Sequence, residues 1–260
     1  MRIQGLQKLT LLDYPEKTAC TLFTAGCNFR CPFCHNAALV THIDNSNFFT
    51  EEYVLDYLKK RKGVLDGVCI TGGEPLLHKD LPEFIKKVKA LGYLIKLDTN
   101  GSYPERLQSL IDDGLIDYVA MDIKNTHEKY LATADCSDDE LQNVIKSVEI
   151  LKQNKIDYEF RTTVVKEYHD AEDIKKIAAN MLAVLKKRLA SLEITAEFDE
   201  SALTAIADAG FDKVYGARPL RRAIQSKIED ALSEKLLDGS IKNGDTVVCK
   251  FNEDFEFVSE

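Results

Sequence analysis

Three cysteines within eight residues are the part of this sequence best suited to chemistry. Cys27, Cys31 and Cys34 have the spacing C-x3-C-x2-C. Three thiolates this close together can hold one metal centre, although a structural zinc site normally takes four ligands. An iron–sulfur cubane also has four irons to ligate, so three ligands leave one metal position open. An open position indicates a site for chemistry rather than a structural site.

A structural zinc site is the alternative interpretation of the same cluster, and it would need a fourth ligand from His35 or Cys20. His35 is adjacent to Cys34 in the sequence, which is poor geometry for chelating the same ion. The other cysteines, namely Cys20, Cys69, Cys136 and Cys249, are scattered, and we expect them to be packing residues.

A glycine-rich motif follows the second run of strand type. It reads Thr71, Gly72, Gly73, Glu74 and Pro75. Two adjacent glycines allow a ligand to approach the backbone closely. The Glu74 carboxylate can accept hydrogen bonds from an ammonium group. We therefore predict a ligand-binding loop here, beside the cysteine loop.

Alternating strands and helices must position these two loops. Strand-like runs occupy residues 18–25, 67–71, 94–98, 118–123 and 158–165, with amphipathic helical patterns between them. A repeated strand–helix pattern predicts parallel strands joined by crossover helices, with chemistry at the carboxyl ends of the strands. Capping boxes are predicted at Asp80 with Glu83 and at Ser137 with Glu140, and Asp170 is predicted to cap a further helix.

The repeated strand–helix pattern ends near residue 180. A short strand at 194–198, helices at 201–209 and 219–237, and a closing pair of strands at 246–251 and 255–258 follow. We therefore predict two domains, at residues 1–180 and 181–260.

The composition excludes several classes of protein. The chain has 260 residues, a net charge of −9 and 45% hydrophobic residues, which is enough apolar material for a core. No apolar run approaches the roughly 18 residues that cross a bilayer, and the N-terminus lacks a secretion signal pattern. An acidic chain without a basic block argues against nucleic acid. We expect a cytoplasmic protein that binds neither membrane nor nucleic acid.

The cysteine and glycine motifs resemble those of the radical S-adenosylmethionine (SAM) enzymes. The resemblance implies a [4Fe–4S] cluster on Cys27, Cys31 and Cys34, with SAM chelating the fourth iron. It implies that the loop at 72–75 (Gly72, Gly73, Glu74 and Pro75) holds the SAM amino group. It also implies reductive cleavage of SAM to a 5′-deoxyadenosyl radical.

Further motifs resemble those of activating proteins for anaerobic ribonucleoside-triphosphate reductase. They are the opening at 9–15, the D-T-N-G run at 98–101 and the D-x-K run at 122–124. The resemblance implies that SAM is contacted by Asp98, Asn100, Asp122, Lys124 and Arg161. The partners it implies are a glycyl radical enzyme, which receives a radical on a backbone glycine, and an electron donor such as flavodoxin or ferredoxin.

The family has a sixth parallel strand, which this sequence lacks before the resemblance fades near Ala179. The expected fold is therefore an α/β partial barrel with five visible parallel strands, followed by a small α+β domain. Residues from about 185 to the end resemble the C-terminal small subdomain of Clp-type AAA+ unfoldases, most distinctly in the G-A-R-P-L-R-R run at 216–222. In that family Arg218 would be the sensor-2 arginine.

The chain contains no G-x-x-x-x-G-K-[S/T] phosphate loop, so we do not expect ATP hydrolysis. The alternative to an active activase is a catalytically impaired fusion, natural or artefactual. Its Clp-like tail would then be an interaction or oligomerisation module.

Overall fold

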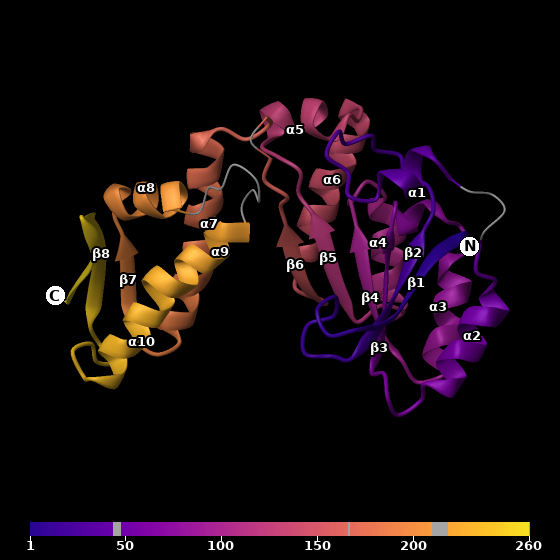
Figure 1. Cartoon of the computed structure of the whole chain (residues 1–260), viewed down its shortest axis with the longest axis horizontal. Coiled ribbons are helices and arrows are strands. Elements are labelled where there is room, and N and C mark those ends of the chain that lie inside the picture. The colour runs from indigo at the N-terminus through magenta and orange to yellow at the C-terminus, as the bar shows by residue number, and fades with distance from the viewer. Residues whose placement is uncertain (44–47, 166, 210–217, 260) are drawn as a thin grey trace. The chain divides into compact units, whose positions relative to one another are not determined.

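The computed structural model describes residues 1–43, 48–165, 167–209 and 218–259 (Figure 1). The chain divides into two compact units, Met1–Thr162 (unit 1) and Thr163–Glu260 (unit 2). The domain boundary predicted near residue 180 falls inside helix α7 of unit 2.

A six-stranded sheet forms the centre of unit 1, and its strand order follows the chain from β1 to β6. The strands are β1 (Ile3–Thr10), β2 (Ala19–Thr24), β3 (Gly67–Gly72), β4 (Leu94–Thr99), β5 (Tyr118–Asp122) and β6 (Asp157–Arg161). The five strands predicted from the sequence are β2 to β6, and all their pairings are parallel as expected. Strand β1 was not predicted, and it pairs antiparallel with β2.

Helices connect these strands and cover one face of the sheet (Figure 1). They are α1 (Ala37–Thr41), α2 (Glu51–Lys60), the 3-10 helix η1 (Pro75–Leu77), α3 (Leu81–Ala90), α4 (Pro104–Asp112), α5 (His127–Ala134) and α6 (Asp138–Leu151). The capping box of Ser137 and Glu140 is present at the start of α6. The one predicted at Asp80 is wrong, because the Asp80 carboxylate pairs with the Met1 amino group and makes no cap hydrogen bond.

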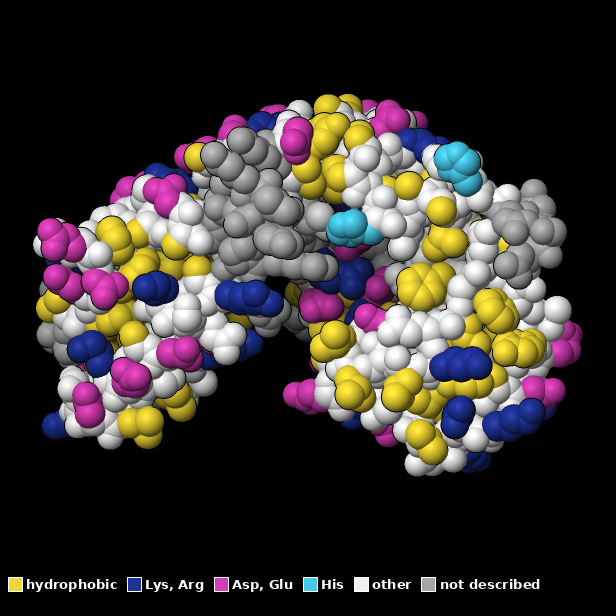
Figure 2. Space-filling model, viewed as in Figure 1, with side chains coloured by type: hydrophobic (Ala, Val, Ile, Leu, Met, Phe, Trp, Pro, Cys, Tyr) yellow, Lys and Arg dark blue, Asp and Glu magenta, His cyan; other side chains and the backbone are white. Residues whose placement is uncertain are grey.

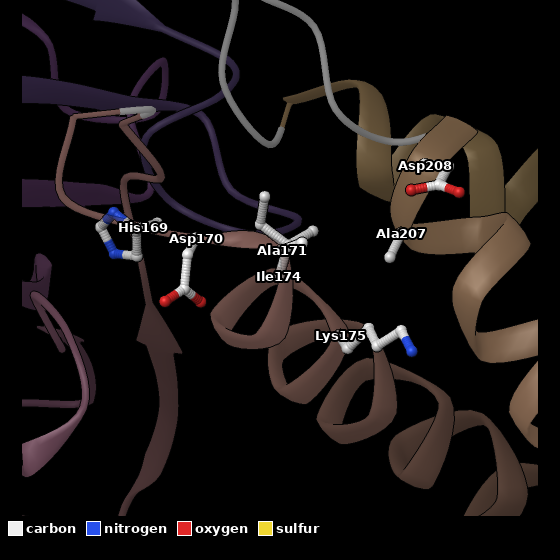
Figure 3. A pocket seen from close by; sticks show the side chains of 7 residues that line it. All are labelled: His169, Asp170, Ala171, Ile174, Lys175, Ala207 and Asp208. Atoms are coloured by element: carbon white, nitrogen blue, oxygen red, sulfur yellow. The ribbon is translucent and has the colours of Figure 1, made fainter.

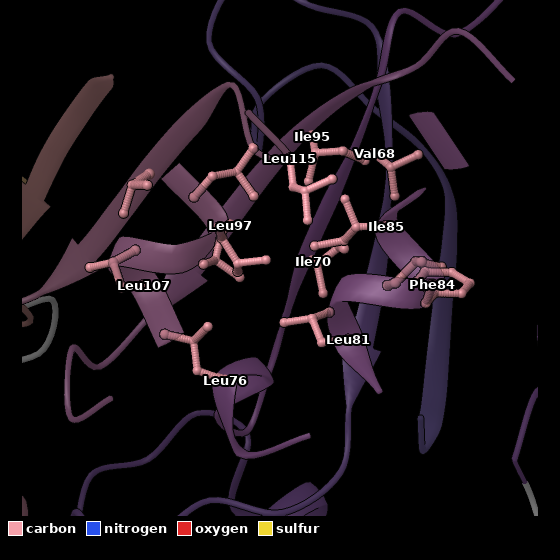
Figure 4. Close-up of a cluster of buried hydrophobic side chains, with 14 of the residues drawn as sticks. Val68, Ile70, Leu76, Leu81, Phe84, Ile85, Ile95, Leu97, Leu107 and Leu115 are labelled. Carbon is pink, nitrogen blue, oxygen red and sulfur yellow. The ribbon is translucent and has the colours of Figure 1, made fainter. Parts of the chain in front are cut away.

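Alternation of apolar and charged side chains along β4 separates a core face from a polar face. In β4, Ile95 and Leu97 are fully buried against the helices, as Figure 4 shows for the surrounding cluster. Lys96 and Asp98 alternate with them and therefore point to the opposite face. Burial of each such apolar side chain contributes about 1.5–3 kcal/mol. The core face thus stabilises unit 1 and leaves the other face free for charged groups.

Unit 2 has its own core around a three-stranded sheet of order β7-β8-β9. Its strands are β7 (Thr195–Phe198), β8 (Thr246–Asn252) and β9 (Asp254–Ser259). Its helices are α7 (Ala171–Ala190), α8 (Glu200–Ala209), α9 (Arg218–Ile224), the π-helix η2 (Gln225–Glu229) and α10 (Asp230–Leu237). Asp170 caps α7 as predicted. Within the described ranges, no helix is long and apolar enough to cross a membrane.

Candidate cofactor site

The cysteine loop begins where β2 ends, at the carboxyl edge of the parallel strands. Helix α5 holds this loop through a single carbonyl group. The Ala134 carbonyl oxygen accepts a hydrogen bond from the Arg30 backbone N–H at 3.2 Å and from the Cys31 thiol at 3.5 Å. Within the loop, the Cys34 N–H donates to the Cys31 carbonyl at 3.1 Å. The loop is therefore an ordered turn fixed to the rest of unit 1.

The thiols of this loop suit an iron–sulfur cluster. Burial raises the pKa of Cys27 to about 12 and also raises the pKa of Cys31, while the Lys124 cation opposes both shifts. Both thiols are therefore protonated in the metal-free protein, and binding of a metal would release their protons. Cysteine thiolate is the usual ligand of such clusters.

A single zinc ion and a four-iron cluster place different demands on the positions of the cysteine thiolates. In the part of the chain that the structure describes, no three His, Cys, Asp or Glu side chains converge on one point as they would around one metal ion. The thiolates that hold a four-iron cluster bind different irons, so they need not converge. The assignment of Cys27, Cys31 and Cys34 as ligands stays a prediction.

The glycine loop after β3 packs directly on the cysteine loop. The Gly73 N–H donates to the Thr24 carbonyl and the Glu74 N–H to the Gly26 carbonyl, both at 2.8 Å. A Cβ on Gly73 would lie 2.0 Å from the Gly26 oxygen, and one on Gly72 would lie 2.3 Å from the Thr24 nitrogen. The space that these glycines provide is therefore occupied by the neighbouring backbone rather than held open for a ligand.

Glu74 is fully buried and links the glycine loop to the loop after β4. Its carboxylate accepts hydrogen bonds from the Leu76 N–H at 3.0 Å, the Thr99 hydroxyl at 2.8 Å and the Asn100 N–H at 2.6 Å. Burial raises its pKa to about 7, and these three bonds oppose the shift. Pro75 opens the 3-10 helix that follows. Contacts of this loop with SAM stay predictions.

Five charged side chains form one network on the polar face of the sheet. Asp98 accepts from Lys96 and, at 3.1 Å, from Arg161. Arg161 also donates to Asp122 at 3.1 Å, and Lys124 donates to Asp122 at 2.9 Å. On the face of unit 1 shown in Figure 2, Asp and Glu side chains lie beside Lys and Arg side chains. The network thus brings four predicted SAM contacts together and adds Lys96.

The electrostatics of this network suit an anionic ligand group. Burial alone would raise the pKa of Asp122, but Lys124 and Arg161 hold it below its usual range. Burial alone would lower the pKa of Lys124 and of Arg161, but the carboxylates raise both. Lys124 and Arg161 are thus charged beside their carboxylate partners, and cations of this kind also bind ligand carboxylates. SAM carries such a group.

Asn100, also a predicted SAM contact, lies against the cysteine loop instead of in the charged network. Its Nδ2 donates to Asn28 Oδ1 at 3.1 Å and to Cys27 Sγ at 3.6 Å. Sequence reasoning missed Asn28, Glu140 and Lys96. For Lys96 a signal existed, because it stands between two apolar residues of a buried strand. For Asn28 and Glu140 no local signal pointed to their pairing.

Unit 2 contains the Clp-like motif, of which residues 216–217 and the Arg218 side chain lie outside what the structure describes. A cavity of about 250 Å³ lies between α7 and α8 (Figure 3). The cavity is lined by His169, Asp170, Ala171, Ile174, Lys175, Ala207 and Asp208. Lys175 is paired with Glu200 at 2.7 Å, and Asp170 caps α7, so both serve the fold of unit 2.

Comparison with known proteins shows the family of the chain. The model of the radical SAM superfamily matches residues 21–181. The chain belongs to the radical SAM superfamily. A protein of Methanocaldococcus jannaschii named as a glycyl-radical enzyme activating enzyme is 37% identical over 183 residues, which cover 68% of this chain and 73% of that protein. A second protein of that organism with the same description is 29% identical, over 61% of this chain and 60% of its own length.

The second part of this radical SAM protein matches a different family. Residues 170–249 match the C-terminal, D2-small domain, of ClpB protein. The chaperone protein ClpB of Oceanobacillus iheyensis is 41% identical over 105 residues, which are 40% of this chain but only 12% of that protein. The resemblances to radical SAM enzymes and to the Clp-type small subdomain are confirmed. The two family matches overlap at residues 170–181, at the start of α7.

Proposed function

We propose that this radical SAM enzyme activates anaerobic ribonucleoside-triphosphate reductase by removing a hydrogen atom from a backbone glycine of that partner. The observation that carries the proposal is the gathering of the cysteine loop, the glycine loop and the charged network at one edge of the sheet. The likeness to proteins named as glycyl-radical enzyme activating enzymes supports the choice of reaction.

In this proposal Cys27, Cys31 and Cys34 hold a [4Fe–4S] cluster, and SAM binds beside it. When bound, these two groups supply a one-electron reductive cleavage that yields a carbon radical. The residues of the chain would hold and orient the cluster and SAM. Lys124 and Arg161 would bind the SAM carboxylate, and the loop at 72–75 would fix the amino group. The apolar core behind the sheet keeps the strand ends rigid.

The reaction also needs an electron source and a compartment in which thiols stay reduced. An electron donor such as flavodoxin or ferredoxin would reduce the cluster. All seven cysteines are free thiols, which suits a cytoplasmic location, where thiols stay reduced. We also propose residues 1–180 as the radical SAM domain and 181–260 as the Clp-like domain, a division by resemblance that falls inside α7 and not at the boundary of the compact units after Thr162.

SAM cleavage in the anaerobically reconstituted full chain tests the chemistry. With dithionite and SAM, we expect 5′-deoxyadenosine, and none from a Cys27/Cys31/Cys34→Ala variant. Cys249→Ala, in the core of unit 2, is the matched control and should retain both cluster and product. Absence of 5′-deoxyadenosine from cluster-loaded wild type would favour the non-catalytic fusion.

The partner is tested in a second step. Addition of anaerobic ribonucleoside-triphosphate reductase should give the EPR signal of a glycyl radical on that protein. SAM cleavage without this signal would reject the reductase as partner while leaving the cleavage chemistry in place.

A further inference from the structure

A chain of hydrogen bonds runs from the start of α6 to the first cysteine. Asn28 Nδ2 donates to Glu140 Oε1 at 2.7 Å and to Ser102 Oγ at 2.9 Å. Asn28 Oδ1 in turn accepts from Asn100 Nδ2 at 3.1 Å, and the same Nδ2 lies 3.6 Å from Cys27 Sγ. Three segments far apart in the sequence therefore meet at one thiol.

Glu140 and Ser102 determine which atom donates and which accepts in each of these hydrogen bonds. Burial would raise the pKa of Glu140, but hydrogen bonds from Ser137 and Asn28 lower it, so its carboxylate is ionised and can only accept. The Asn28 amide must therefore turn its NH2 to Glu140 and its oxygen to Asn100. Asn100 Oδ1 also accepts from the Ser102 N–H at 2.9 Å. Its NH2 is thereby fixed towards Cys27.

We infer that Glu140 and Asn28 are positioning residues, which hold the Asn100 amide as an N–H donor to the Cys27 sulfur. This inference rests on the proposed function, because it treats Cys27 as a ligand of the cluster. A donor to a ligating sulfur stabilises the extra negative charge of the reduced cluster and so raises its reduction potential. Glu140, which lies on a distant helix, would thus tune the cluster without touching it.

The surroundings make this hydrogen bond effective. Asn100 and Ser102 are buried, with 6% and 3% of their surfaces exposed. Hydrogen bonds shielded from water are stronger and polarise one another. Glu140 also belongs to the capping box of α6, because its Oε2 accepts from the Ser137 N–H at 2.9 Å. The carboxylate is therefore held in place by the helix that carries it.

The Glu140→Gln variant reverses the hydrogen bond between residue 140 and Asn28 while the side chain keeps nearly the same shape. Glutamine still completes a capping box, but its NH2 would face Asn28 and force that amide to turn. Asn28 would then turn its NH2 towards the Asn100 NH2, which the Ser102 N–H keeps on that side. The contact between two donors would push the Asn100 amide away from Cys27. The matched control is Glu149→Gln on the same helix, whose exposed carboxylate pairs only with Lys152 among the described contacts.

Two spectroscopic readouts test the inference on the reconstituted full chain. ENDOR of the reduced cluster after exchange into D2O should show the deuterons of the Asn100 amide and of the Phe29 N–H, which also donates to Cys27, in wild type and Glu149→Gln. Glu140→Gln should lose the Asn100 deuteron and keep that of Phe29. The midpoint potential from an EPR-monitored titration should be lower in Glu140→Gln than in both others. An unchanged deuteron signal or an unchanged potential in that variant would overturn the inference.

A compensating double variant distinguishes an effect of hydrogen-bond direction from a general disruption of the structure. Glu140→Gln with Asn28→Asp places an acceptor-only carboxylate at the middle position, which accepts from the new amide and again from Asn100. The deuteron signal should return, and its failure to return would also overturn the inference. A wild-type protein that takes up no cluster would instead refute the proposed function itself.

Discussion

Replacing Asp98 by asparagine tests whether the charged network is balanced as the structure indicates. Lys96 has 1% of its side chain exposed, and Asp98 is its carboxylate partner among the described contacts. Removal of one partner of a buried ion pair costs about 3–5 kcal/mol, because the other charge stays buried. We expect about 3 kcal/mol, the lower end, since the new amide oxygen can still accept from Lys96. The Tyr118 ring, 5.9 Å from Lys96 Nζ, does not compensate because it is present before and after the change.

A double-mutant cycle makes this expectation refutable. Lys96→Met together with Asp98→Asn removes both charges, and such replacement is often neutral or stabilising relative to the pair. The double variant should therefore be at least about 1 kcal/mol more stable than Asp98→Asn alone. A double variant as unstable as the sum of its single changes would refute the reasoning.

Hydrogen exchange is the suitable assay for this cycle. The chain has no tryptophan, and a two-unit protein does not give a single two-state denaturation curve. Exchange measured on peptides from β4 and β5 in the metal-free protein reports the stability of unit 1 directly.

Three further predictions follow from other parts of the structure. Glu74 binds its proton more tightly in the fold, where its pKa rises from 4.5 to about 7, so the stability of unit 1 should fall by about 3 kcal/mol from pH 4.5 to 7. Glu74→Gln should remove this slope in hydrogen exchange, and an unchanged slope would contradict the assignment. Gly73→Ala should cost about 1–3 kcal/mol by overpacking against Gly26 and reduce cluster uptake. Its comparison is Gly63→Ala, which strains a backbone of φ +81° but whose added Cβ would meet nothing within 4 Å. Equal cluster uptake in both would refute the steric argument. A fragment of residues 163–260 should melt cooperatively by circular dichroism, because the core of unit 2 lies wholly within it; a fragment without a transition would show that its core is insufficient.

The sequence predicted the elements whose patterns are local. The strands β2 to β5 are short and mostly apolar, and the capping box at Ser137 needs only residues of its own helix. Strand β1 was missed because its residues, with a glycine and several polar side chains, show no clean alternation. Its position is determined by pairing with β2, which no local pattern reveals.

The candidate site was predicted as a set of residues but not as a set of contacts. The strand-end motifs correctly placed Asp98, Asp122 and Arg161 near one another, since parallel strands end at one edge. That these groups neutralise one another depends on side-chain directions across three strands. The capping box predicted at Asp80 was wrong for a similar reason. Its carboxylate pairs with the Met1 amino group, which lies 79 positions away in the sequence, so no local pattern could reveal the pairing.

Strand β6 has a consequence for solubility. It is the last strand in the order of the sheet, and no described strand pairs with its outer side. Unpaired strands invite edge-to-edge aggregation, which proteins resist with short strands and charged side chains. β6 has five residues, and three of them are Asp157, Glu159 and Arg161. A radical SAM sheet that ends early is thus protected from self-association by the charges of its own final strand.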